Sequence, residues 1–536
     1  MQRRRFLQLA AGSTLLAGCK RIQHMSIPVT LHLPGQREGH WLRDLKSLPA
    51  SSGELRTGTV ILGSGVAGLT AAWKLAREGY RDFVLLAGPE PYGNAAAGEM
   101  AGLRYPRGAH YLPLPSLESV HVREMLADFG VIESGAATAR PHFDERVLVH
   151  APESRVLYQG RWQEGTLPSK GIPADEAAQQ QRFFRHIDAL KVARGADGRR
   201  VFCIPLAQSS QDPRWTALDR LSFAAWLTRE GYSAPTLRWY LDYACRDDYG
   251  AGLGQVSAWA GLHYFASRAG QAANADDGAV LTWPDGLNPL TRRLQQAATG
   301  ATGGRWQPGF ALQLSDGGHG VDILCAESAA ADARVFTVRA ERAICAMPLQ
   351  LAQRVVPALG VPGDAAVPHV PWLVSNFLLR GFPPELAGEA LSWDNVVYGS
   401  QSLGYVVSTH QLIRQARPEQ TVFSAYHALA HDTPANIRRW LMQAGTDELY
   451  ELANSDLRAA YGHHLWLNTQ SVEITVRGHA MVSPAPGFLS RPGIAALRGA
   501  DQRLLFAHSD LSGISVFEEA AWWGWRAALA VLGGVG

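Results

Sequence analysis

The sequence predicts an α/β protein of more than one domain, and three observations carry this prediction. A short apolar stretch at 59–62 leads into a glycine-rich loop, a helix-like segment and a second apolar stretch at 83–86, the order of a βαβ unit. Strand-like stretches return at 305–348 and 504–507, whereas residues 116–280 look largely helical. A chain of 536 residues exceeds one ordinary core, so up to about three domains, or a fold that winds twice between two larger domains, would fit.

The composition is that of a globular protein. Hydrophobic residues make up 46% and charged residues 18%, and no apolar run reaches the ~20 residues needed to cross a bilayer. The formal net charge of +2 gives no basis for nucleic-acid binding, so none is expected. No two of the five cysteines have CxxC spacing, so no metal site or redox dithiol is predicted; buried free thiols, or one disulfide, are expected instead.

The first nineteen residues have the features of an export signal rather than of folded structure. Residues 3–7 (RRRFL) resemble a twin-arginine signal, and residues 16–19 (LAGC) resemble a bacterial lipobox, in which Cys19 becomes the lipid-bearing first residue. Residues 1–19 are therefore predicted to be a lipoprotein signal peptide, with the mature protein periplasmic and anchored to the membrane through Cys19. An ordinary basic start followed by a buried helix is the alternative. Residues 20–55 are polar and without periodicity, which predicts a tether.

The glycine-rich loop has GxGxxG spacing at a strand–helix junction, the context in which this motif binds a dinucleotide. In such a loop Gly63 makes the tight turn, Gly65 lets the backbone approach a diphosphate, and Gly68 lets the helix pack on the strand. The helix N-terminus adds free N–H groups and a partial positive charge. A coincidental glycine-rich turn is the alternative. The predicted cofactor contacts in this loop are Gly63, Ser64, Gly65, Val66, Ala67 and Gly68.

A second pattern lies near the C-terminus. A buried strand leading into residues 506–510 (FAHSD) is followed by a loop and a helix-like segment at 516–528 (VFEEAAWWGWRAA). This stretch resembles the closing signature of flavin-containing amine oxidases, a superfamily that includes phytoene-type desaturases and related isomerases. The resemblance implies that Asp510 hydrogen-bonds the ribityl chain of FAD, with a plain helix-capping role as the alternative. It also implies that the helix starting at Val516 and Phe517 aims its N-terminus at the flavin.

The resemblance implies a Rossmann-like FAD-binding domain that is interwoven with a mixed α+β substrate-binding domain. Residues 56–115, 281–350 and 481–536 are expected to form the FAD-binding domain. Residues 116–280 are expected to form a mainly helical substrate domain, and residues 351–480 its second part.

Further contacts follow from the same resemblance. Gly93 and Asn94 stand where the family has a paired glycine. Gly108, Ala109 and His110 resemble the segment that passes beside the flavin. His110 is the predicted catalytic residue, with a structural hydrogen-bonding role as the alternative.

Three departures limit what the resemblance implies. The family has an acid for the adenosine ribose where this chain has Ala87, so either Glu90 reaches the ribose or the contact is missing. No lysine follows Lys191, so the lysine that holds a water against the flavin in many amine oxidases is absent. No cysteine lies near the C-terminal helix, so a covalent flavin bond is not expected.

The implied activity is FAD-dependent oxidation of an amine or polyamine, by hydride transfer to flavin. The substrate is a small molecule, and the electron acceptor is oxygen or a respiratory partner. Two alternatives stay open: a desaturase- or isomerase-like enzyme acting on an apolar substrate, and a lipoprotein that keeps the fold without catalysis. Asp247 and Asp248 either attract a cationic polyamine or serve as a helix end or salt-bridge partners. One or two of several aromatic residues are expected to touch the substrate: Trp239, Tyr240, Tyr243, Tyr249, Trp259, Tyr264 and Trp523.

Overall fold

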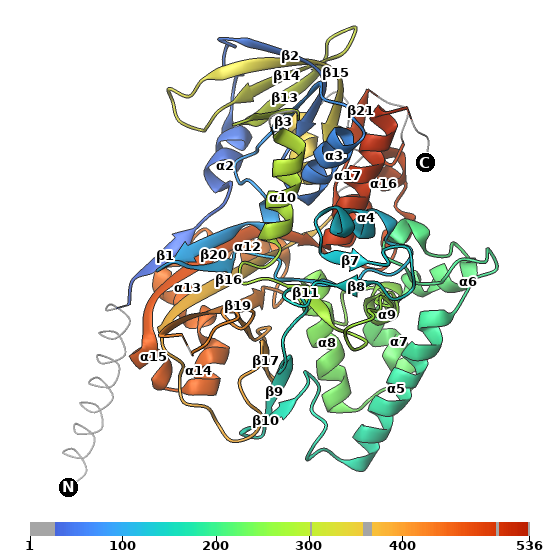
Figure 1. Cartoon of the computed structure of the whole chain (residues 1–536), viewed down its shortest axis with the longest axis vertical. Helices are drawn as coiled ribbons and strands as arrows, with labels where there is room; N and C mark the ends of the chain where they lie inside the picture. The colour runs from blue at the N-terminus through green and yellow to red at the C-terminus, as the bar shows by residue number, and fades with distance from the viewer. Residues whose placement is uncertain (1–26, 301–302, 357–366, 417, 500–502, 534–536) are drawn as a thin grey trace.

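The computed structural model describes residues 27–300, 303–356, 367–416, 418–499 and 503–533. Figure 1 shows a seven-stranded sheet with its helices at the top, an eight-stranded sheet at the lower left and a group of helices at the lower right. The predicted signal peptide and its Cys19 lie outside the described residues. Within the described part of the chain, no helix is long and apolar enough to cross a membrane.

The seven-stranded sheet takes its strands from three distant parts of the chain. Parallel pairing joins β12, β3, β2, β15 and β21, and β14 and β13 extend the sheet in antiparallel fashion. β2, β3 and β21 end in fully buried runs, as expected of parallel strands that are covered on both faces. The strands are β2 (Glu54–Leu62), β3 (Phe83–Leu86), β12 (Arg305–Gln307), β13 (Phe310–Asp316), β14 (Val321–Ala326), β15 (Val335–Cys345) and β21 (Leu504–Phe506).

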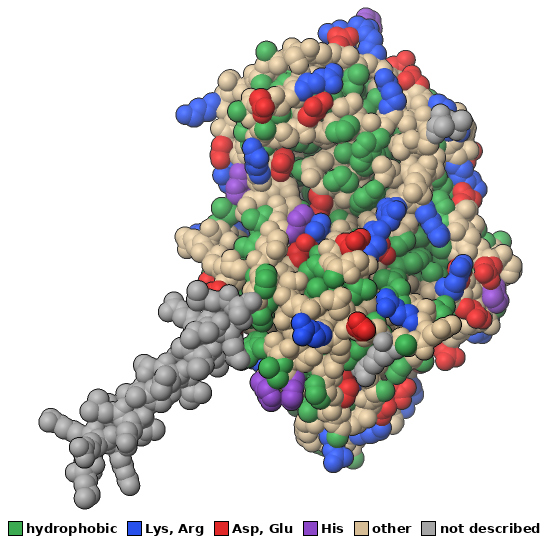
Figure 2. Space-filling model, turned by 60° about the vertical axis from the view of Figure 1, so that its left-hand side comes forward, with side chains coloured by type: hydrophobic (Ala, Val, Ile, Leu, Met, Phe, Trp, Pro, Cys, Tyr) green, Lys and Arg blue, Asp and Glu red, His purple; other side chains and the backbone are tan. Residues whose placement is uncertain are grey.

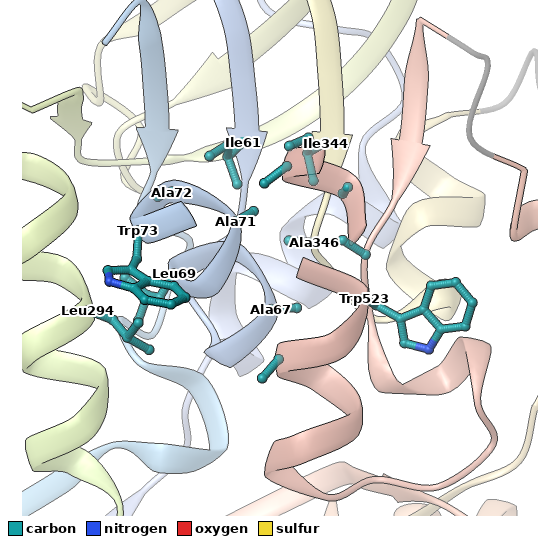
Figure 3. Close-up of a cluster of buried hydrophobic side chains, with 14 of the residues drawn as sticks. Ile61, Ala67, Leu69, Ala71, Ala72, Trp73, Leu294, Ile344, Ala346 and Trp523 are labelled. Carbon is teal, nitrogen blue, oxygen red and sulfur yellow. The ribbon is translucent and has the colours of Figure 1, made fainter. Parts of the chain in front are cut away.

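Helix α3 (Val66–Arg77) packs between α10 (Asn288–Thr299) and α17 (Phe517–Val531). Figure 3 shows this core, with Ile61 and Ile344 from the sheet, Leu69 and Trp73 from α3, and Leu294 from α10. A Cβ on Gly524 would lie 2.0 Å from the carbonyl oxygen of Ala67, so α17 approaches α3 to a distance that only glycine allows. The C-terminal helix is thereby fixed to the start of the first βαβ unit.

The eight-stranded sheet has the order β1-β20-β16-β19-β18-β17-β9-β10. Its strands are β1 (Val29–His32), β9 (Ser154–Tyr158), β10 (Arg161–Glu164), β16 (His369–Arg380), β17 (Asp394–Val397), β18 (Tyr405–Val407), β19 (Gln420–Ala428) and β20 (Thr469–Val482). Apolar side chains of four short helices pack on it: α12 (Pro434–Leu441), α13 (Thr446–Ala453), α14 (Ser455–Tyr461) and α15 (His464–Asn468).

The helical part has its own aromatic-rich core, formed by α5 (Ala174–Val192), α7 (Phe223–Arg229), α8 (Pro235–Tyr249) and α9 (Ala258–Ala266). The predicted helical domain 116–280 is too broad in two places. α4 (Val120–Asp128), β7 (Ile132–Ser134) and β8 (His142–Phe143) bury apolar side chains in the core of the seven-stranded sheet. β9 and β10 belong to the other sheet, because β9 pairs with β17.

The predicted tether over residues 20–55 is wrong for the described part of that segment. β1 pairs in parallel with β20 at the edge of the eight-stranded sheet. Helix α2 (Gln36–Asp44) follows, and its Trp41 ring lies edge-on to Phe310, with ring centroids 5.9 Å apart. Backbone pairing and this aromatic contact order a segment whose polar composition gives no sign of structure.

Shorter elements complete the molecule: β4 (Ala97–Met100) with β5 (Leu103–Pro106), β6 (Tyr111–Pro113) with β11 (Val280–Thr282), α6 (Pro213–Thr216), α11 (Leu349–Val355) and α16 (Pro492–Leu497). Cys203, Cys245, Cys325 and Cys345 are buried free thiols, as predicted. On the face drawn in Figure 2, acidic and basic side chains are interspersed, in keeping with the small net charge.

Candidate active site

The glycine loop forms an open cradle at the N-terminus of α3. Gly63 has φ +111°, and a Cβ on Gly68 would lie 1.9 Å from the Gly63 carbonyl oxygen, so both positions need glycine. A Cβ on Gly65 would meet no atom within 4 Å. Gly65 caps α3 without a side-chain hydrogen bond, which leaves the N–H groups of the first turn for a ligand. This cradle fits the diphosphate of a dinucleotide.

Two further predicted segments lie against this loop. Tyr92 N–H donates to the Ser64 carbonyl oxygen at 3.1 Å, and a Cβ on Gly93 would lie 3.5 Å from the Gly65 Cα. The Ala109 N–H donates to the Asn94 carbonyl oxygen at 2.7 Å. A Cβ on Gly108 would come within 2.1 Å of the same oxygen. The structure therefore brings 63–68, 93–94 and 108–109 together, although they come from separate stretches of the chain.

At the predicted ribose-binding position, the residues form hydrogen bonds within the protein. Ser64 Oγ donates to the Ala87 carbonyl oxygen at 2.5 Å. Both oxygens of Glu90 accept hydrogen bonds from Arg477 of β20, at 2.7 and 3.0 Å. Burial opposes ionisation of Glu90, but the charge of Arg477 and hydrogen bonds from His32 and Arg477 lower its pKa overall. A ribose contact by Glu90 stays a prediction, because its carboxylate is already bound.

Asp510 lies in a short 3-10 turn before α17, and its carboxylate already has hydrogen-bond partners within the protein. It accepts from Leu349 N–H at 2.9 Å and from His369 Nε2 at 3.0 Å, and His508 Nδ1 lies 3.1 Å away. Burial opposes ionisation of Asp510, but the charges of His508 and His369 lower its pKa well below the usual value. Both ring nitrogens of His369 face oxygens, one of the Asp510 carboxylate and one of the Val367 carbonyl at 3.1 Å, so the ring is held from both sides.

The N-terminus of α17 is also uncapped. Val516 precedes the helix without a side-chain hydrogen bond, and Phe517 begins it, 8% exposed. Glu518 and Glu519 in the same turn are buried, and burial raises the pKa of each to about 7. Glu519 accepts from Leu206 N–H and from a serine hydroxyl, so this carboxylate also has protein partners.

A cavity of about 250 Å³ begins at His110. The ring of His110 lies 4.5 Å from Tyr426, 5.0 Å from Tyr111 and 5.6 Å from Trp393, measured between ring centroids. Burial lowers the pKa of His110 to about 3, so its imidazole is neutral at physiological pH. Three of the aromatic residues singled out in the sequence also line the cavity, namely Tyr240, Tyr243 and Tyr264.

The other aromatic candidates lie elsewhere. Tyr249 and Trp259 are fully buried in the helical core. Trp523 lies on α17, and its Nε1–H donates to Ser512 Oγ at 2.7 Å. Trp239 is absent from the cavity lining and stacks on Tyr243 behind the wall.

The adjacent carboxylates Asp247 and Asp248 have separate environments. Asp248 pairs with Arg268 at 2.6 Å, and the guanidinium of Arg268 lies 3.9 Å from the Tyr264 ring centre. Asp247 lines the cavity and accepts from Tyr111 Oη at 3.4 Å. Burial, with repulsion from Asp248, raises the pKa of Asp247 to about 7. The salt-bridge role therefore belongs to Asp248, and Asp247 faces the site.

Another carboxylate of the cavity wall was missed in the sequence. Asp394 is the first residue of β17, and burial together with repulsion from Asp247 raises its pKa to about 8. Its neighbour Trp393 and Tyr426 of β19 were missed as well. No local pattern marks these residues, because they reach the cavity only through the pairing of distant strands.

Comparisons with known proteins bear on this architecture. Residues 61–129 match the family model of an NAD(P)-binding Rossmann-like domain. No curated protein matches the sequence. Wild-type putrescine oxidase bound to putrescine is 16% identical with a TM-score of 0.62, covering 90% of this chain and 100% of that chain. Cyclohexylamine oxidase from Brevibacterium oxydans IH-35A is 16% identical with a TM-score of 0.60, covering 89% and 98%.

A third similar structure is the CLA-producing fatty acid isomerase from P. acnes, 15% identical with a TM-score of 0.58, covering 88% of this chain and 97% of that chain. At such identities these likenesses establish the fold. The class of fold is a Rossmann-like dinucleotide-binding domain combined with a second domain. More particularly, the chain shares the fold of putrescine oxidase and cyclohexylamine oxidase, and the predicted fold class is confirmed.

Proposed function

We propose that this protein binds FAD and oxidises an amine at the carbon beside nitrogen. The observation that carries the proposal is the cavity at His110, whose wall combines a neutral imidazole, aromatic rings and carboxylates. Aromatic faces and carboxylates favour a cationic group. Putrescine oxidase and cyclohexylamine oxidase share the fold, which supports the same class of reaction here.

FAD would be held at the α3 cradle, with its diphosphate at Gly65 and the uncapped N–H groups, and with Gly93 and Gly108 beside it. Bound FAD supplies the acceptor for a hydride, and the protein supplies orientation and dryness. Asp510 and Glu90 support this site through their partners, because both carboxylates are already hydrogen-bonded.

His110 is the proposed catalytic residue, and its role is to orient the amine. An ammonium group must lose a proton, which passes to solvent, before the neighbouring carbon can give up a hydride; His110, whose pKa burial lowers to about 3, stays neutral and can accept a hydrogen bond from the resulting amine and orient it. The His110 carbonyl accepts from Thr282 Oγ1 at 2.7 Å, which fixes the backbone. The ring itself packs on Tyr426 and faces the cavity.

The apolar-substrate alternative fits this cavity less well, although a fatty acid isomerase shares the fold. Asp247 and Asp394 line the cavity, and an apolar chain would leave both carboxyl groups without a partner. The non-catalytic alternative draws support from Glu90 and Asp510, whose carboxylates bind protein groups. The open cradle at Gly65 counts against it.

The export features belong to the same proposal. Twin-arginine export carries folded proteins, so the cofactor would travel with the chain to the periplasm, and Cys19 would anchor it to the membrane. Electrons would pass to oxygen or to a respiratory partner.

The test is an absorption spectrum of residues 20–536, the chain without its predicted signal peptide and lipid-bearing cysteine, before and after anaerobic addition of amines. A flavin spectrum that bleaches with an amine would support the proposal. Bound flavin that no amine reduces would overturn amine oxidation and favour the desaturase-like alternative. Absence of flavin after incubation with FAD would overturn both enzyme functions and favour the non-catalytic one.

A further inference from the structure

Two cavity carboxylates lack the cation that usually accompanies a buried acid. Asp394 begins β17, and Asp247 lies near the end of α8. Neither forms an ion pair with any described residue. Arg268 is the basic residue in the cavity wall, and its guanidinium pairs with Asp248. The two carboxyl groups therefore face a shared space in which the protein provides no free positive charge among the described residues.

The walls around these carboxylates suit an organic cation. Trp393 and Tyr243 line the same part of the fold, where α8 packs on the eight-stranded sheet. An aromatic face attracts an ammonium group within about 6 Å of its centre, most strongly where water is excluded. A carboxylate beside such faces supplies the charge that a cation needs when it leaves water.

The opening of the cavity is acidic as well. Glu153 is exposed and lines the cavity, and its neighbours Asp276 and Glu164 are also exposed. Burial, with repulsion from Asp276 and Glu164, raises the pKa of Glu153. Carboxylates around an opening increase the local concentration of cations there.

The volume limits the ligand to a small molecule. A cavity of about 250 Å³ has room for about eight water molecules, at ~30 Å³ each. His110 and Asp394 line this one space, so a short chain with a nitrogen at each end can contact both.

We propose that Asp394 and Asp247 form a subsite for a second, non-reacting ammonium group, so that the substrates are short diamines rather than monoamines. This inference rests on the proposed amine oxidation, in which His110 accepts a hydrogen bond from the reacting nitrogen. The second nitrogen stays charged and pairs with the carboxylates. Asp394 is thus a specificity-determining residue.

Binding at this subsite has a proton balance. In the empty cavity near neutral pH, Asp394 holds a proton, because burial and Asp247 raise its pKa. An arriving ammonium converts the carboxyl group to a carboxylate, and the displaced proton passes to solvent. The other charged or titratable groups facing this space are Asp247, Glu153, Arg268, His110 and the tyrosines of the wall.

The experiment is calorimetric titration of the purified, flavin-loaded protein with 1,4-diaminobutane and with butylamine, under anaerobic conditions. The wild type is expected to bind the diamine at least tenfold more tightly, with proton release seen as a dependence of the heat on buffer ionisation. Asp394→Asn is expected to remove this preference and the proton release. Asp332→Asn, which removes an exposed charge from the loop between β14 and β15, should change neither.

Asp247→Asn gives a second reading of the subsite should the Asp394 variant fold poorly, as judged by circular dichroism. Equal affinity for the two amines in the wild type, or a preference that survives both variants, would overturn the inference. The flavin spectrum tests the amine oxidation separately. A diamine that binds through Asp394 without bleaching the flavin would overturn the oxidation and support the subsite. Bleaching by both amines at equal affinity would support the oxidation and overturn the subsite.

Discussion

Asp510, before α17, and Asp394, at the start of β17, are carboxyl groups shielded from water, and their charges differ. At Asp510, two histidines and a backbone N–H lower the pKa well below its usual value. At Asp394, burial and Asp247 raise the pKa to about 8. Burial is common to both, so the partners decide the charge. The protein supplies hydrogen-bond partners for the carboxylate of Asp510, whereas we propose that a ligand supplies the partner of Asp394.

The largest effect is expected from removing Asp510, the carboxylate whose hydrogen-bond partners the protein itself supplies. Asp510→Ala leaves the Leu349 N–H and the buried His369 Nε2 without their acceptor, and at about 1–3 kcal/mol for each unpaired buried donor we expect a loss of about 3–5 kcal/mol in the free energy of unfolding. Urea denaturation measures this loss. Asp332→Ala, on the exposed loop, should stay within about 0.5 kcal/mol of the wild type. A loss below about 1 kcal/mol for Asp510→Ala would show that its partners contribute little.

His110, in the cavity wall, should matter for rate rather than for stability. His110→Ala is expected to slow anaerobic flavin reduction by about tenfold, the loss of one orienting hydrogen bond to the amine. Stopped-flow absorbance measures this rate. His142→Ala, which removes a histidine from β8 outside the cavity lining, is the matched control. An unchanged rate in His110→Ala would assign His110 to the structural role.

The glycine loop at the N-terminus of α3 allows a test of where FAD binds. Gly65→Ala adds a methyl group where no protein atom lies within 4 Å, so it should leave the fold intact and weaken FAD by about tenfold, or ~1.4 kcal/mol. Flavin fluorescence during titration of the apoprotein measures this affinity. Gly39→Ala in α2, which is equally open, should not change it. Unaltered affinity in Gly65→Ala would place the diphosphate elsewhere.

The smallest effect is the pH dependence that separates the two carboxylates. The folded-state pKa of Asp394, about 8, exceeds the unfolded value of about 4, so its ionisation opposes folding increasingly as pH rises from ~4 to ~8. Asp394→Asn should therefore gain stability over the wild type through this window, by at least ~1 kcal/mol at pH 9. The pKa of Asp510 is lowered instead, so its contribution is present above pH ~4 and disappears in acid. Melting temperatures at pH 2, 5 and 9 measure both trends, and parallel trends for Asp394→Asn and Asp510→Ala would contradict this account.

The glycine loop could be predicted well from the sequence because its signals are local. The residues 63–68 form a contiguous motif whose strand and helix are visible beside it, and the structure gives them the expected turn and uncapped helix. Asp510 was also found from its position before the last helix. Its partner His369 was not, because a histidine at the start of β16 carries no mark of the carboxylate that it meets across the fold.

The substrate side was largely beyond sequence reasoning. Asp394 and Tyr426 belong to strands that a long, weakly patterned region supplies, and their neighbours in space depend on strand order. The same reason explains β1, whose four residues became ordered by pairing with β20. Asp247 was singled out because two adjacent acids stand out in an aromatic helix, but only the fold distinguishes it from Asp248.

The contact between Gly524 and Ala67 has a consequence for the order of assembly during synthesis. The first βαβ unit emerges early, but its sheet receives β21, and its helix receives α17, only when residues 504–531 have been made. Contacts of such long sequence separation form late. Until then the cradle at Gly65 rests on a half-built domain, so a ribosome-bound chain is expected to hold its dinucleotide weakly and to capture it fully only after the last helix has docked.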